Sequence, residues 1–180
     1  MSKALEQLTA GEWAVLALLD EQSTHGFALA RALEPEGEVG RVWSVRRPLV
    51  YRALETLERK GLVAPVETLP SPRGPQRTMF AATGAGERAL AGWLREPVTH
   101  VRDGRSLLML KLLFLTRRQV DPTALLTQQR DHFACLAQTL SQAAQDTGGF
   151  HRTLVLWRLE TTTAAVRFTE VMLAERSEAD

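Results

Sequence analysis

The sequence predicts a mainly α-helical protein whose first half contains a two-stranded hairpin between helices. Hydrophobic residues recur at helical spacing in most segments, and two short apolar segments flank the proline- and glycine-rich stretch 70–75. A second break at 96–104 precedes a remainder whose pattern indicates helix throughout. Three helices followed by a hairpin and a fourth helix are typical of a winged helix-turn-helix. We therefore expect a winged helix-turn-helix domain with a two-stranded wing over 1–96 and a helical C-terminal dimerisation domain over 97–180.

Each element of the first half has a local signal in the sequence. In order, we expect helices over 8–20, 26–33 and 48–60, strands over 63–69 and 77–82, and a fourth helix that ends near residue 94. Thr9 and Thr83 are suited to cap the first and fourth helices, because a hydroxyl oxygen accepts a free N–H of the first turn. Gly61 suits the end of the third helix, since glycine adopts the left-handed conformation without a steric penalty. Residues 23–25 are predicted to form the turn between the first two helices.

The second half predicts three helices, over 106–116, 121–145 and 150–174. Asp121 is expected to cap the second of them, with Pro122 at its first helical position. Gly148 and Gly149 are expected to form the turn before the last helix. Both long helices carry apolar residues at alternating spacings of three and four, which predicts an antiparallel helical hairpin.

One hairpin cannot bury all the apolar residues of these two helices. A second copy of the same hairpin is the simplest cover, and it would give a two-fold dimer. The alternative is an intramolecular core packed under the N-terminal domain. The side chains predicted to form the dimer interface are Leu126, Phe133, Leu136, Leu140, Leu154, Trp157 and Phe168.

The composition excludes several classes of protein. With 22 Lys and Arg against 21 Asp and Glu in 180 residues, the net charge of +1 excludes a polycation that coats nucleic acid. The one cysteine, Cys135, permits no intramolecular disulfide and fits a reducing cytoplasm, and no segment resembles a membrane span or a signal peptide. The histidines form no metal-ligand spacing, and nucleotide-binding glycine motifs are absent. We expect a cytoplasmic protein that is not an enzyme and needs no metal or cofactor; a helical enzyme using Cys135 is a rival interpretation.

The predicted third helix carries the highest local charge. Residues 41–52 contain four arginines and no acidic residue, a local charge of +4 in a chain of net +1. Apolar side chains occupy one face of this helix, and the other face begins with basic residues that can meet phosphates while the first turns reach base edges. A surface helix can carry arginines as a solvated face alone, but here the hairpin adds basic residues beside it. The side chains predicted to contact DNA are Arg46, Arg47, Pro48, Tyr51 and Arg52 on the helix and Arg73, Gln76 and Arg77 on the wing.

Several of these segments together resemble the PadR family of transcriptional regulators. They are residues 8–19, His25-Gly26-Phe27, residues 49–54 and 57–63, the wing 74–80, residues 82–86, and residues 110–114. The resemblance implies a bacterial repressor that binds DNA as a homodimer held by its C-terminal helices. It places Tyr51 on the DNA-contacting helix and Arg77 on the wing. The family usually has tyrosine where this chain has Phe27, and a Ser-Pro-Gly-like turn where it has Arg46-Arg47-Pro48.

We interpret the chain as a sequence-specific regulator of transcription, a repressor that binds a pseudo-palindromic operator in double-stranded DNA as a homodimer. Some PadR-family members release DNA on binding phenolic acids or hydrophobic drugs, which implies a small hydrophobic or aromatic effector. Trp93, Phe133 and Trp157 are the residues predicted to line its pocket. The alternative is a winged-helix protein–protein adaptor that uses the same basic face for an acidic partner.

Overall fold

The computed structural model describes residues 8–70 and 76–177 and divides into two compact units. The first unit comprises Met1–Leu94 with Met109–Phe114, and the second comprises Arg95–Leu108 with Leu115–Asp180. The sequence-based division assigned all of 97–180 to the second domain, whereas the segment 109–114 groups with the first unit. Within the described ranges, no helix is both long enough and apolar enough to cross a membrane.

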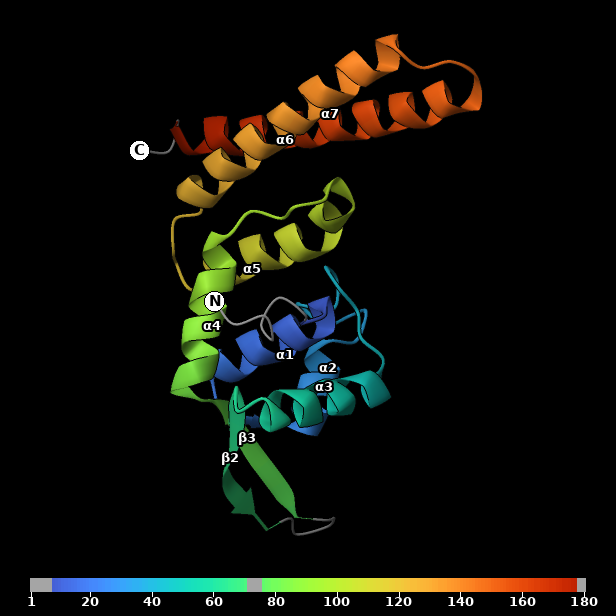
Figure 1. Cartoon of the computed structure of the whole chain (residues 1–180). Coiled ribbons are helices and arrows are strands. Elements are labelled where there is room, and N and C mark those ends of the chain that lie inside the picture. Colours follow the sequence, from blue (N-terminus) through green and yellow to red (C-terminus); the bar gives the residue numbers. More distant parts are fainter. Residues whose placement is uncertain (1–7, 71–75, 178–180) are drawn as a thin grey trace. The chain divides into compact units, whose positions relative to one another are not determined.

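The first unit is a winged helix-turn-helix, as the sequence predicts (Figure 1). Its elements are α1 (Ala10–Glu21), β1 (Thr24–His25), α2 (Gly26–Ala32), α3 (Arg47–Arg59), β2 (Val63–Leu69), β3 (Arg77–Ala82) and α4 (Gly84–Arg95). The sheet is antiparallel in the order β1-β3-β2. The predicted two-stranded wing is present as the β2–β3 hairpin, and the short strand β1 adds a third strand to the sheet. The sequence missed β1 because two residues are too few to show a strand pattern, and their pairing with β3 is a long-range contact.

Local capping explains where the helices of this unit begin and end. Thr9 and Glu12 form a capping box at α1, with the Glu12 N–H donating to Thr9 Oγ1 at 3.3 Å and the Thr9 N–H donating to the Glu12 carboxylate at 2.7 Å. Gly61 follows α3 with φ of +69°, in the left-handed region that favours glycine. Thr83 caps α4 through the Gly86 N–H and also donates to the Gly61 carbonyl at 2.7 Å, so one hydroxyl joins the end of α3 to the start of α4.

The core of the first unit is apolar and centred on α1, all of whose residues from Trp13 to Leu19 are buried. Trp13 stacks on Trp93 of α4 with ring centroids 4.7 Å apart and planes 9° from parallel. Lys111 is 2% exposed; its ammonium donates to the Trp93 carbonyl and lies 4.7 Å from the centroid of the Trp93 ring. This arrangement explains why Met109–Phe114 groups with the first unit.

The second unit contains η1 (Val101–Asp103), η2 (Gly104–Leu108), the end of α5 (Met109–Arg117), α6 (Thr123–Gln145) and α7 (Gly149–Ser177). Helices α6 and α7 form the expected hairpin (Figure 1), and Gly149 at the turn has φ of +56°. The start of α6 differs from the prediction, since Pro122 precedes the helix. Asp121 still satisfies a free donor, because its carboxylate accepts the Thr123 N–H at 3.1 Å. The predicted helix 106–116 begins with the π-helical turn η2.

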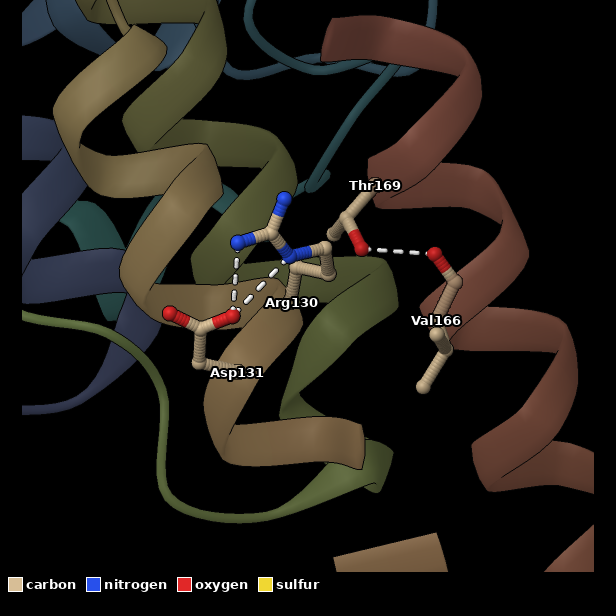
Figure 2. Close-up of polar contacts among 4 residues, drawn as sticks. All are labelled: Arg130, Asp131, Val166 and Thr169. Carbon is tan, nitrogen blue, oxygen red and sulfur yellow. Dashed lines mark hydrogen bonds and ion pairs between the residues drawn. The ribbon is translucent and has the colours of Figure 1, made fainter. Parts of the chain in front are cut away.

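Helix α7 buries a narrow face and leaves its large apolar side chains exposed. The buried residues are Val155, Thr162 and Thr169, at seven-residue spacing, whereas Trp157 is 70% exposed. Threonine can be buried in a helix because its hydroxyl hydrogen-bonds to the backbone of the same helix. Thr162 donates to the Arg158 carbonyl at 2.7 Å, and Figure 2 shows Thr169 donating to the Val166 carbonyl at 2.7 Å.

Polar residues of α6 are satisfied in two different ways. Gln129 is fully buried, and its side-chain amide accepts from the Val98 N–H at 2.7 Å and donates to the Val98 carbonyl at 3.0 Å. Arg130 and Asp131 instead pair with each other at 2.7 Å near the solvent (Figure 2). The Gln129 pair closes a buried backbone segment, whereas an exposed ion pair of this kind contributes little.

Candidate nucleic-acid interface

Helix α3 segregates its two faces cleanly. Val50, Ala53, Leu54 and Leu57 are buried. The predicted contact residues of this helix are all exposed: Arg46, Arg47, Pro48, Tyr51 and Arg52. The structure therefore brings them together on the solvent side of one helix, over its first two turns.

The beginning of α3 is positively charged and lacks a side-chain cap. Arg46 occupies the N-cap position without a capping hydrogen bond, and the first turn contains no acidic residue. Across residues 8–70 and 76–177, no carboxylate lies within ion-pair distance of Arg46, Arg47 or Arg52. Their charge adds to the positive end of the helix dipole, which favours an anion here.

Arg47 lies against two aromatic rings. Its Cζ atom is 5.1 Å from the centroid of Phe27, on α2, and 5.8 Å from the centroid of Tyr51, one turn further along α3. Both distances are within the range of cation–π attraction. The Tyr51 ring packs closely over Gly26, where an added Cβ would come within 2.6 Å of Tyr51 Cε1. Glycine at position 26 thus lets the tyrosine ring approach the start of α2.

His25 connects α2 to the wing. Its Nδ1 atom accepts the Ala28 N–H at 3.1 Å and so caps α2, which fixes the other ring nitrogen as the protonated one in the neutral side chain. The backbone of His25 is paired with Met79 of β3. One residue therefore sets both the first turn of α2 and the attachment of that helix to the sheet.

The wing contributes two of its three predicted contact residues to the described surface. Gln76 and Arg77 are exposed at the start of β3, where Arg77 pairs with Leu69. Arg73 lies outside the described residues.

The predicted dimer residues fall into three groups. Leu126 and Phe133 are fully buried, so the structure removes them from any surface that a partner could cover. Leu136 and Leu140 are half-buried. The α7 residues remain accessible, with exposed fractions of 41% for Leu154, 70% for Trp157 and 37% for Phe168.

The predicted effector-pocket residues do not share one environment. Trp93 is buried in the first unit against Trp13, and Phe133 and Trp157 belong to the second unit. Phe133 is fully buried, whereas Trp157 is 70% exposed. Within the described ranges, no group of three or more metal-binding side chains occurs, and Cys135 is an exposed free thiol.

Sequence reasoning missed the role of two residues at this surface, Phe27 and Gly26. In the sequence, Phe27 differs from the tyrosine that is usual at this position in the PadR family. The spacing of Arg47 and Tyr51, four residues apart on one helix, signals that these two side chains are neighbours. The contribution of Phe27 depends on how α2 and α3 pack, which the sequence alone does not reveal.

The order of helices and the wing place the first unit in the winged-helix class of proteins. Residues 15–92 match the family model described as the transcriptional regulator PadR-like family. A probable transcriptional regulator of Mycobacterium tuberculosis is 32% identical over 92 residues, which is 51% of this chain and 47% of that protein. The chain thus matches about half the length of this curated relative. Residues 15–92 of the N-terminal unit are therefore similar to PadR-like transcriptional regulators.

The solved structures that this chain matches include PadR from Bacillus subtilis, whose structure is a complex with operator DNA. That chain is 21% identical, with a TM-score of 0.46 over 90% of this chain and 97% of its own length. A Streptococcus mutans protein is 16% identical, with a TM-score of 0.44 over 91% of this chain and 98% of its own.

Proposed function

We propose that this protein is a sequence-specific DNA-binding repressor that acts as a homodimer on a pseudo-palindromic operator. The observation that carries the proposal is the unpaired basic surface over the first two turns of α3, beside a wing that exposes Gln76 and Arg77. Cations at this position can neutralise phosphates, and the first turns of such a helix reach base edges in the major groove.

The roles of the side chains follow from their chemistry. The guanidinium groups of Arg47 and Arg52 have the fork of donors that matches the O6 and N7 atoms of guanine. Tyr51 offers a hydroxyl to a phosphate, and Arg46 at the uncapped start of α3 adds charge for the backbone. Arg77 and Gln76 of the wing, with Arg73, meet the backbone or the adjacent minor groove.

The apolar face of α7 supports a second copy of the chain as the partner. Phe150, Leu154, Trp157, Phe168 and Val171 are all exposed, and their spacings of four, three, eleven and three residues keep them on one face of the helix. A row of large apolar side chains in water marks an interaction site. Two copies joined by a two-fold axis would present two α3 helices, which matches an operator with two half-sites about 34–36 Å apart.

The test is selection of bound fragments from a pool of random duplex DNA, with the mass of the protein measured in parallel. The proposal expects a symmetric consensus with half-sites about one helical turn apart, an affinity that falls steeply with salt, and twice the 20.0 kDa mass of one chain. Recovery of no preferred sequence at low salt, with an acidic protein captured by the same face, would instead establish the adaptor. A single-chain mass would overturn the homodimer.

Repression and effector release are finer predictions. If the protein is a repressor, its binding to an operator that overlaps a promoter would lower transcription of a reporter gene in cells. Such binding requires that the protein be in the cytoplasm, where the bacterial chromosome lies. A small hydrophobic or phenolic effector stays a prediction from the family resemblance, since its three predicted pocket residues lie in different environments. Titration of aromatic compounds against the operator complex would reveal it as release of DNA.

A further inference from the structure

Phe27 is an apolar side chain on the same surface as the arginines of α3. It is the second residue of α2 and is 47% exposed. Its ring lies 5.1 Å from Arg47 Cζ, and Tyr51 approaches the same atom at 5.8 Å. One guanidinium group is therefore held near two aromatic rings that come from two different helices.

We propose that Phe27 is a positioning residue that, together with Tyr51, orients Arg47 to read a guanine in the major groove. The inference rests on the proposed function, because it concerns how that surface discriminates between DNA sequences. An unrestrained arginine loses rotamer freedom when it binds a base, and a side chain that is already ordered loses less. Contact with an aromatic ring uses the face of the guanidinium and leaves the N–H donors in its plane available for the two acceptors of guanine.

Arg47 is singled out among the arginines of this surface. Across residues 8–70 and 76–177, neither Arg46 nor Arg52 has an aromatic ring within cation–π distance. Arg47 is also the first residue of α3, in the part of a recognition helix that reaches base edges. The second ring is itself restrained, because Tyr51 packs on Gly26 so closely that a Cβ there would lie 2.6 Å from its Cε1 atom.

The experiment compares four variants, Phe27→Leu, Phe27→Tyr, Arg47→Ala and the double variant Phe27→Leu/Arg47→Ala. Affinity is measured for the selected operator and for random duplex of the same length, over a series of salt concentrations. Phe27→Leu should lower the ratio of specific to random affinity by roughly three- to fivefold per protomer, the range expected for an exposed cation–π contact. Phe27→Tyr retains the ring and should stay within about twofold of the wild type, whereas Arg47→Ala lowers the ratio further.

Two readouts separate positioning from a structural or direct role. The slope of log affinity against log salt concentration should be unchanged in Phe27→Leu, because the charge of Arg47 remains. In Arg47→Ala the slope should fall by about one only if Arg47 also neutralises a phosphate. In the Arg47→Ala background, Phe27→Leu should have no further effect on the ratio. Each operator guanine is replaced in turn by 7-deazaguanine, which lacks the N7 acceptor. At one position this change should lower the operator affinity of the wild type roughly tenfold and that of Arg47→Ala little.

Three results would overturn the inference. The first is an unchanged ratio of specific to random affinity in Phe27→Leu. The second is additive losses in the double variant, which would mean that Phe27 contacts DNA independently of Arg47. The third is the absence of any operator guanine whose replacement has an effect that depends on Arg47. Each of these presupposes a preferred operator, so they are distinct from failure of the proposed function, in which no preferred sequence is selected. Equal thermal unfolding of Phe27→Leu and the wild type excludes a folding defect at this exposed position.

Discussion

Helices α3 and α7 are each buried on one side, but they expose opposite chemistry. The exposed side of α3 begins with arginines, and its buried side is uniformly apolar. On α7 the exposed side carries large apolar residues such as Trp157, and the buried side includes Thr162 and Thr169. When the polar and apolar faces of a helix are separate, the sequence shows which face is buried. A helix with apolar residues on several faces needs two partners, and the sequence does not show which face packs on the same chain and which on another molecule.

The comparison predicts that the two exposed faces serve different partners, and the largest effect is expected for DNA. Replacing Arg46, Arg47 and Arg52 together by alanine should lower operator affinity by at least about a hundredfold, since each arginine contact is worth about 1–3 kcal/mol. Gel retardation or fluorescence anisotropy at fixed salt measures the effect. Arg167→Ala, which removes an exposed charge from α7, is the matched control and should leave the affinity nearly unchanged. Equal losses in both variants would mean that only net charge matters.

The next effect concerns the apolar face of α7. Trp157→Glu should raise the dimer dissociation constant by about a hundredfold or more, because each protomer would bring an unpaired carboxylate into an apolar interface. Sedimentation velocity over a range of concentrations measures this change. Thr163→Glu adds the same charge to an exposed position of α7 that lies off the apolar face, and it should remain dimeric. If Trp157→Glu sediments as the wild type does, a different surface joins the chains.

The first unit was more predictable than the second for a physical reason. The ranges of β2 and β3, the Thr9 cap and Gly61 all follow from local rules about alternation, free N–H groups and left-handed backbone. The sequence did not predict strand β1 or the contact of Phe27 with Arg47, because both depend on contacts between segments distant in the sequence.

In the second unit, periodicity identified the hairpin but not its inner face. On α7, Val155 is buried and Leu159 is half-buried, whereas the larger Trp157 is exposed. Gln129 is a polar residue at a fully buried position of α6, where its amide pairs with the backbone of Val98. A buried amide needs a specific backbone partner, and the sequence does not show that the segment near Val98 returns to α6.

A moderate effect is therefore expected inside the second unit. Gln129→Leu should lower the free energy of unfolding by roughly 2 kcal/mol, because the buried N–H and carbonyl of Val98 would both lose their partner. Chemical denaturation monitored by circular dichroism measures this change. Gln128→Leu makes the same substitution at the exposed neighbouring position and should change the stability by less than about 0.5 kcal/mol. Equal stabilities of the two variants would show that the amide pair is dispensable.

The smallest effect lies at the polar contact between the two ends of the α6–α7 hairpin. Hydrogen bonds from the Thr123 side chain, at 2.8 Å, and from its backbone N–H lower the pKa of Asp121 below its ordinary value of 3.8, with a further contribution from Arg176 at 3.6 Å. A carboxyl whose pKa is lower in the folded state stabilises the fold at pH values above its ordinary pKa, and this contribution disappears as the pH falls through the folded-state pKa. The stability difference between the wild type and Asp121→Asn should therefore be constant near neutral pH and shrink below about pH 4. Thr123→Ala removes the largest cause, so carbon-detected titration should show the Asp121 pKa moving back toward 3.8, and an unmoved pKa would mean that Arg176 is the dominant partner.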